Sequence, residues 1–281
     1  MPNPMKTLLP LAAGLALGTW FAKRLVPPQA RTLCPPAGQA GIRRQMEQLK
    51  REYEKQDRMR RDFTANVSHE LKTPLTSISG YAEIIREGMV KSEDVGRFAG
   101  KIYEEAQRLI TLVEDILNLS HLDEGAPGQE RRQGIDLYAL CERAVASLAE
   151  AARQRGIAIS LTGSRQRVDG AEKLLAEIIF NLCDNAIKYN KENGQVTVLV
   201  SETQEQVVLT VEDTGIGIPS EEVERIFERF YRVDKSHSRA IGGTGLGLSI
   251  VKHGAAYHKA KIEVNSTVGE GTAISVIFPK S

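Results

Sequence analysis

The octapeptide Ser68-His69-Glu70-Leu71-Lys72-Thr73-Pro74-Leu75 places a histidine, a carboxylate and a hydroxyl on one helical turn, just ahead of a proline. An imidazole with such neighbours suits phosphoryl chemistry. Taken singly the motif is weak, because a solvated helix face carries the same residue types at least as often. Its meaning depends on the helices around it and on the residues downstream.

Apolar residues recur at spacings of three and four on both sides of this octapeptide. The pattern predicts a long helix from Ile42 to about Gly88, bent or loosened at Pro74, and a second helix over about 95–116. Two long helices joined by so few residues must be antiparallel, and each apolar stripe is wider than one partner can cover. We therefore expect a homodimer held by a four-helix bundle.

His69 lies two residues from both Val67 and Leu71, so it points away from the buried seam. A carboxylate beside the imidazole, here that of Glu70, favours the tautomer that leaves the other ring nitrogen able to attack. Thr73 follows one turn later on the same face, where its hydroxyl could position a water molecule for the reverse, hydrolytic reaction.

The N-terminus contains an uncharged, largely apolar run at residues 7–22. As a helix it would reach about 24 Å, which is short for a hydrocarbon core of ~30 Å. A short membrane helix, an uncleaved signal anchor and a cleaved secretory signal all fit this run. From Lys23 to Asp62 the sequence contains eleven Lys and Arg but only five Asp and Glu. This basic excess favours a single anchor in the cytoplasmic membrane with the rest of the chain in the cytoplasm.

Length and composition bound the remaining possibilities. A chain of 281 residues with 41% hydrophobic residues has room for about two domains. The net charge of +1 provides no field to recruit nucleic acid, so no direct nucleic-acid partner is expected. The sequence has three cysteines, Cys34, Cys141 and Cys183, and their spacing is not that of a metal site. Their odd number argues against a disulfide framework and indicates reduced thiols. For Cys141 and Cys183 we expect core packing.

After a polar break at residues 123–134, helical and strand periods alternate, which predicts a separate α/β unit. Helices are expected over 137–155, 171–189 and 246–257, and strands over 157–161, 195–201 and 206–212. The helix over 171–189 has a second, polar face that carries Glu177, Asn181, Asn185 and Lys188. The carbonyl oxygen of Asn185 suits Mg²⁺. Lys188 can neutralise phosphate, with Tyr189 nearby as a hydroxyl donor.

Two glycine-containing segments complete the polar pattern. In Asp213-Thr214-Gly215-Ile216-Gly217 the carboxylate could accept from an exocyclic amine such as that of adenine, and the glycines allow backbone to approach the base. Gly242-Gly243-Thr244-Gly245-Leu246-Gly247 enters a helix, whose free amides can cradle phosphate. The weakly apolar stretch between them resembles a lid. Arg232 could bind the terminal phosphate bidentately, while Phe227 and Phe230 pack.

These segments, in this order, resemble the boxes of bacterial two-component sensor histidine kinases. The segments are SHELKTPL (68–75), NLCDNAIKYN (181–190), DTGIGIP (213–219), IFERFYR (226–232) and GGTGLGL (242–248). The resemblance spans residues 63–279. It implies a dimeric helical hairpin followed by a Bergerat-type α/β sandwich, a mixed sheet with helices on one face.

The resemblance also implies roles for single residues. His69 would be the phosphoacceptor, Glu70 its assistant, and Thr73 with Glu70 a phosphatase signature. ATP and Mg²⁺ would be the cofactors, with Asn185 for the metal and Asp213 for adenine. The other nucleotide contacts would be Asn181, Lys188, Tyr189, Gly215, Gly217, Gly243, Thr244, Gly245, Leu246 and Gly247, with Arg232 as a further catalytic group.

The expected organisation has four parts: an anchor at 1–26, a linker and signalling helix at 27–62, a dimerisation and phosphotransfer domain at 63–125, and an ATP-binding catalytic domain at 133–281. No sensory domain fits between the apolar run and residue 63. Input would come through the anchor, an accessory sensory protein or the membrane. The expected partner is the receiver domain of a response regulator. An ATPase or serine kinase with the same nucleotide fold, and a non-catalytic ATP-binding scaffold, are the alternatives.

Overall fold

The computed structural model describes residues 37–123, 130–233 and 243–280. The chain divides into two compact units, Met1–Asp62 and Phe63–Ser281. The anchor expected at 1–26, the first part of the linker with Cys34, and part of the stretch expected to act as a lid lie outside the described residues. Within the described ranges, no helix is long and apolar enough to cross a membrane.

The octapeptide lies in α2 (Ala37–Arg86), which begins earlier than the expected Ile42. A turn and the short η3 (Ser92–Asp94) lead to α3 (Val95–Asp123), so the two predicted helices are confirmed. Pro74 is buried inside α2. Its ring removes one helical hydrogen bond, yet the helix continues for another three turns. Near the connector, the rings of Tyr81 and Phe98 pack edge to face with centroids 5.7 Å apart.

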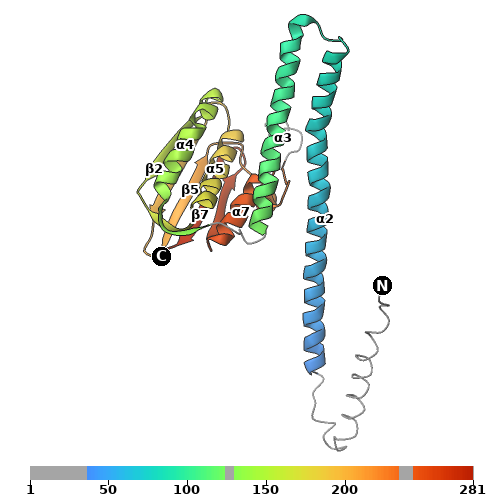
Figure 1. Ribbon diagram of the computed structural model, residues 1–281. Coiled ribbons are helices and arrows are strands. Elements are labelled where there is room, and N and C mark those ends of the chain that lie inside the picture. Colours follow the sequence, from blue (N-terminus) through green and yellow to red (C-terminus); the bar gives the residue numbers. More distant parts are fainter. Residues whose placement is uncertain (1–36, 124–129, 234–242, 281) are drawn as a thin grey trace, which may run out of the picture. The chain divides into compact units, whose positions relative to one another are not determined.

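An α/β unit follows the helices along the chain, as predicted (Figure 1). Its elements are β1 (Arg131–Asp136), α4 (Leu137–Gln154), β2 (Ala158–Gly163), β3 (Arg167–Ala171), α5 (Glu172–Lys188), β4 (Gln195–Glu202), β5 (Gln206–Asp213), η4 (Ser220–Glu222), η5 (Arg225–Phe227), α7 (Gly247–Tyr257), β6 (Lys261–Thr267) and β7 (Gly271–Pro279).

Five strands form one sheet in the order β2-β4-β5-β7-β6, in which β2 and β4 are parallel and the other pairs antiparallel. This is the mixed sheet that the resemblance implied. Alternate residues of the central strands, such as Val196, Val198 and Val200, are fully buried against α4 and α5. Helices α4, α5 and α7 therefore cover one face of the sheet (Figure 1).

The two described cysteines pack in this core, as expected. Cys141 on α4 and Cys183 on α5 have no exposed surface. Burial raises the pKa of each thiol to about 12. Both therefore serve as small apolar side chains, because a thiol at so high a pKa is not a nucleophile at neutral pH.

Four strands were missing from the expected pattern. β1 and β3 pair as a separate two-stranded sheet, and their residues are too polar or too few to show alternation. β6 and β7 close the large sheet. The alternation of β7 is plain, since Thr272, Ile274, Val276 and Phe278 are its buried residues, so the sequence carried a signal there.

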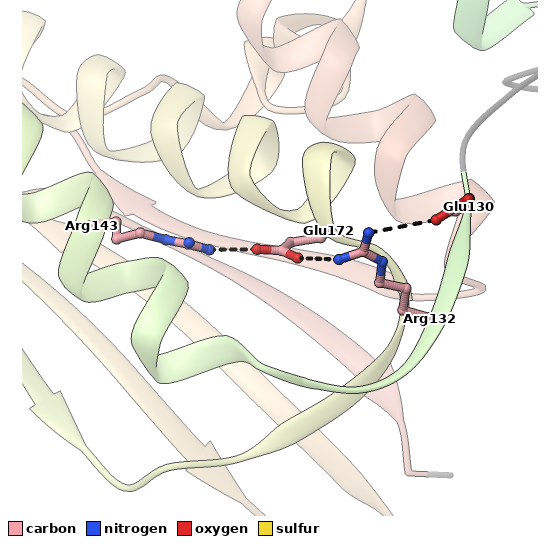
Figure 2. Close-up of polar contacts among 4 residues, drawn as sticks. All are labelled: Glu130, Arg132, Arg143 and Glu172. Atoms are coloured by element: carbon pink, nitrogen blue, oxygen red, sulfur yellow. Dashed lines mark hydrogen bonds and ion pairs between the residues drawn. The ribbon is translucent and has the colours of Figure 1, made fainter.

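A carboxylate at the first position of α5 ties the small sheet to the helices, as Figure 2 shows. Glu172 lies 2.7 Å from Arg143 of α4 and 3.3 Å from Arg132 of β1. Arg132 also lies 3.5 Å from Glu130. These side chains are exposed, so the network contributes little to the stability of the fold.

Candidate nucleotide site

A cavity of about 460 Å³ opens where α5, the end of β5, α7 and β7 meet, next to α3. Its size is in the ordinary range for a site that holds one small molecule. The predicted residues that line it are Asn181, Asn185, Lys188, Tyr189, Asp213, Gly217, Arg232, Gly243, Thr244, Gly245 and Gly247. Residues up to 66 positions apart in the sequence are thus brought to one wall.

The polar face of α5 forms one side of the cavity. Asn181 donates through Nδ2 to the carbonyl of Glu177 at 2.9 Å. Its Oδ1 faces Gly247, where an added Cβ would lie only 2.6 Å away. Asn185 lies one turn further, and Lys188 pairs with Asp184 at 2.6 Å. The start of α7 therefore approaches the amides so closely that a larger residue at position 247 would require the Asn181 side chain to shift.

The end of β5 forms the opposite, more apolar side. Asp213 accepts a hydrogen bond from the Gly215 amide at 2.8 Å, and its neighbour across the sheet is Thr272. Burial raises the pKa of Asp213, while the bonds from the Gly215 and Thr272 amides act in the opposite direction. Ile216, Ile218, Val211 and Ile274 also line this end. An anionic acceptor among apolar walls suits a flat heterocycle with an exocyclic amine.

The loop after Asp213 depends on one glycine conformation. Gly217 has a φ of +69°, and a Cβ there would lie 2.1 Å from the carbonyl oxygen of Thr267. The loop packs on the β6–β7 turn through the Gly269 amide, which donates to Ile216 at 2.8 Å. Position 217 consequently excludes every other side chain.

The segment before the glycine run closes on the run itself. The Phe230 amide donates to the Gly245 carbonyl at 2.8 Å. Both residues have positive φ, +62° and +73°. Arg232 also lies on the cavity wall. Burial raises the pKa of the Tyr189 hydroxyl, and the nearby charge of Arg232 lowers it by a smaller amount. A cation therefore lies at the glycine-rich end of the cavity.

His69, Glu70 and Thr73 do not line the cavity. The side chain of His69 on α2 is 67% exposed, as its position off the seam predicted, and its Nδ1 lies 3.6 Å from Oε1 of Glu70. The Thr73 hydroxyl donates to the His69 carbonyl at 3.2 Å. The structure therefore places a possible acceptor and its carboxylate together, apart from the nucleotide residues.

Two of the predicted nucleotide contacts lie off the cavity wall. Gly215 and Leu246 are not on the cavity wall. Leu246 is fully buried, and it meets the site only through its amide, 3.3 Å from the Thr244 hydroxyl. Glu177, on α5, does not line the cavity, and one of its carboxylate oxygens is buried without a hydrogen-bond partner among the described residues.

Sequence reasoning missed several residues of the wall. Asp184 and Thr272 were within reach, because they lie beside the asparagines of α5 and in an alternating strand. Thr111 and Asp115 belong to α3. No sequence signal links those two to the site, since helix α3 precedes α5 by a long stretch of chain.

The oxygen groups around Asn185 fit a magnesium ion. Asn185, Asp184 and Asn181 all line the same part of the wall. Mg²⁺ takes one or two protein oxygens and completes its shell with water and phosphate. No group of three or more His, Cys, Asp or Glu that could hold a metal occurs in the described part of the chain.

The cavity and its polar residues define the class: an α/β nucleotide-binding unit attached to a helical hairpin with an exposed histidine. Family models match both parts. Residues 59–125 match the His Kinase A (phospho-acceptor) domain. Residues 170–281 match the histidine kinase-, DNA gyrase B- and HSP90-like ATPase. The chain belongs to the two-component sensor histidine kinases.

Similar proteins agree with that assignment. The chain is 38% identical over 232 residues to the sensor histidine kinase WalK of Bacillus subtilis, covering 81% of this chain and 38% of WalK. It is 39% identical over 230 residues to the sensor-like histidine kinase SenX3 of Mycolicibacterium smegmatis, covering 82% and 60%. The chain thus spans only part of these relatives.

A solved structure shares the fold. The histidine kinase ThkA in complex with the response regulator protein TrrA aligns with a TM-score of 0.62 at 23% identity, over 82% of this chain and 66% of that chain. At this identity the likeness concerns the fold alone.

Proposed function

We propose that the protein is an ATP-dependent protein-histidine kinase, which phosphorylates itself on His69 and passes the phosphoryl group to an aspartate of a response regulator. The observation that carries the proposal is the cavity with Asp213 at its apolar end and the glycine run at its polar end. This polarity matches a nucleotide with its base on one side and its phosphates on the other.

At the base end, Asp213 would accept from the exocyclic amine of adenine. The carboxylate is held by the Gly215 amide at 2.8 Å, so its geometry is set before the nucleotide enters. Apolar side chains around it would exclude water from the ring. Guanine carries a carbonyl at the equivalent position, and that carbonyl would meet a carboxylate. The site therefore favours adenine over guanine.

At the phosphate end, the backbone amides that lead into α7 lie at the N-terminus of a helix, where anions are favoured. Lys188 and Arg232 line the same cavity and would neutralise the transferred group. Mg²⁺ bound with the nucleotide would supply further charge neutralisation, and Asn185 with Asp184 would hold it. Catalysis by positioning and charge is what phosphoryl transfer requires.

His69 would supply the nucleophile. With Glu70 3.6 Å from Nδ1, the carboxylate would hold a proton there and leave the Nε2 lone pair for attack. A nitrogen–phosphorus bond would form to the γ-phosphorus as the bond to the β-phosphate oxygen breaks, and ADP would leave. Because His69 does not line the cavity, transfer requires either a movement of the ATP-binding unit relative to the hairpin or transfer across the dimer.

Partners follow from the surface of the hairpin. Leu75, Tyr103, Ile110 and Leu117 of α2 and α3 are each about half exposed or more in the single chain. A second copy would bury them in a four-helix bundle. The complex of ThkA with TrrA supports a response regulator as the phosphoryl acceptor. We also propose that Thr73 with Glu70 serves the reverse, phosphatase reaction, and that residues 7–22 anchor the protein to the membrane, where an accessory sensory protein could act on it.

The test is labelling with γ-³²P-ATP of the wild type and of His69→Gln. The wild type should acquire phosphate that is lost in acid and kept in base. His69→Gln should bind ATP as tightly and acquire none. Retained labelling in His69→Gln would refute the acceptor assignment, and an acid-stable label would indicate a serine or threonine kinase instead.

A second variant tests the nucleotide site. Asn185→Ala should lose Mg²⁺-ATP binding and labelling together, while adenosine, which has no phosphates, should bind as before. Normal Mg²⁺-ATP binding by Asn185→Ala would refute the metal role of Asn185.

A further inference from the structure

A hydrogen bond joins α3 to the glycine run within the second unit. The hydroxyl of Thr244 donates to Oδ2 of Asp115 at 2.6 Å. Both residues line the nucleotide cavity, and Thr111 of α3 lines it one turn earlier. The wall of the cavity therefore includes a helix of the phospho-acceptor domain.

Apolar packing holds this contact in place. Leu112 and Leu119 of α3 are buried in one cluster with Leu246 and Ile250 at the start of α7. They stand three residues before and four residues after Asp115, so they lie on the same face of the helix. Asp115 is thus presented to Thr244 by a packed helix.

The site that Asp115 occupies is one that favours anions. The Thr244 hydroxyl, which donates to Asp115, also accepts from the Leu246 amide at 3.3 Å, at the beginning of α7. Backbone amides at a helix start attract phosphate for the same electrostatic reason that they attract a carboxylate. Asp115 therefore binds a hydrogen-bond donor, the Thr244 hydroxyl, that a nucleotide's phosphates would use.

The surroundings of Asp115 already carry other carboxylates. Burial raises the pKa of Glu177, and the nearby charge of Asp115 raises it further. One carboxylate oxygen of Glu177 is buried without a hydrogen-bond partner among the described residues. Burial raises the pKa of Asp115 as well, with Asp184 and Glu114 repelling its charge and Lys188 attracting it. A triphosphate beside Asp115 would add to this repulsion.

We infer that Asp115 is a residue of the nucleotide site and that its carboxylate competes with the phosphates of a bound nucleotide for the hydroxyl of Thr244. The inference rests on the proposed function. Binding of ATP weakens the contact between Thr244 and α3 by a certain factor. That contact lowers the affinity for ATP by the same factor. The phospho-acceptor domain thereby controls nucleotide affinity through one side chain.

The test compares nucleotide binding by the full-length wild type with that of Asp115→Ala, Asp115→Asn and Glu114→Gln. ATP and adenosine are each titrated against a fluorescent ATP analogue. Asp115→Ala should bind ATP more tightly by roughly tenfold or more, the size expected for loss of one charge-assisted hydrogen bond. Adenosine affinity should be unchanged. Asp115→Asn, whose amide oxygen can still accept from Thr244, should show a smaller gain.

Glu114→Gln is the matched control, because it removes the same charge from the adjacent, exposed position of α3; its ATP affinity should stay within about twofold of the wild type. Unchanged or weaker ATP binding by Asp115→Ala, or an equal gain for adenosine, would overturn the competition. If the wild type binds ATP and labels His69 while Asp115→Ala behaves like it, only the competition fails. A wild type that binds no ATP refutes the proposed function and the competition together.

Discussion

The amide of Ala171, at the start of α5, donates to Nε2 of the buried His258 at 3.0 Å. Nδ1 of the same ring lies 2.7 Å from the Gly254 carbonyl. With an acceptor at one nitrogen and a donor at the other, the imidazole is neutral. His258 thus caps α5, whose own first residues provide no side-chain cap, and it links the helix that carries the asparagines to the end of α7.

This arrangement predicts a loss of stability in acid. Burial lowers the pKa of His258 from 6.5, with a smaller contribution from Arg131 in the same direction and an opposing one from the Gly254 bond. Below pH 6.5 the unfolded chain takes up a proton that the folded chain does not. The stabilisation is therefore present above this pH and is lost as the pH falls below it, by up to about 1.4 kcal/mol per pH unit from this group.

The measurement is the free energy of unfolding in urea at pH 7.5 and pH 5.5. His258→Gln can still accept from Ala171 but does not titrate, so its free energy of unfolding should fall less over this interval than that of the wild type. His121→Gln, at an exposed position of α3, is the control and should keep the wild-type slope. An equal slope for His258→Gln would contradict the role of His258.

Adenine recognition can be separated from phosphate binding. Replacement of Asp213 by Asn removes the charge that would accept the exocyclic amine. ATP, ADP and adenosine should all bind more weakly by about the same factor, roughly tenfold or more, since the lost contact is to the base. Calorimetric titration of the three ligands checks this. A loss for ATP without a loss for adenosine would place Asp213 at the phosphates instead.

The glycine at 217 should be far less tolerant than the glycine at 269. Both have positive φ, +69° and +84°, but an added Cβ meets the Thr267 carbonyl at 2.1 Å only at 217, and nothing within 4 Å at 269. Gly269→Ala should cost about 1–2 kcal/mol of stability from the left-handed conformation alone. Gly217→Ala should cost more and weaken ATP binding. Denaturant unfolding and ATP titration measure the two effects, and equal costs would refute the steric argument.

Thr73 can be tested against a neighbour with the same geometry. Thr73 and Thr76 each donate to the carbonyl four residues earlier, at 3.2 and 2.8 Å. Thr73→Ala should retain labelling of His69 but slow the dephosphorylation of the response regulator by about a hundredfold, the usual contribution of a group that positions a proton transfer. Thr76→Ala should leave both reactions unchanged. Comparable slowing in Thr76→Ala would show that the helix, not the hydroxyl, is responsible.

Local pattern was sufficient for the helices and for most of the site. The spacing of apolar residues predicted α2, α3, α4 and α5 with boundary errors of up to about seven residues, because an amphipathic helix repeats its signal over several turns. Asn181 and Asn185 could be assigned to one face from their separation alone. The same reasoning failed for β1 and β3, which are short and polar. Their pairing depends on contacts with each other, and neither strand carries a signal of its own.

Sequence alone therefore determined the order of the boxes, the exposed position of His69 and the polar face of α5, since each depends on spacing within one element. Only the tertiary structure decided that Thr272 stands opposite Asp213, that Glu172 holds β1 to α4, and that Asp115 reaches Thr244. These contacts join residues from 29 to 129 positions apart. Their partners depend on which elements pack together, and that choice of neighbour leaves no periodic pattern in the sequence.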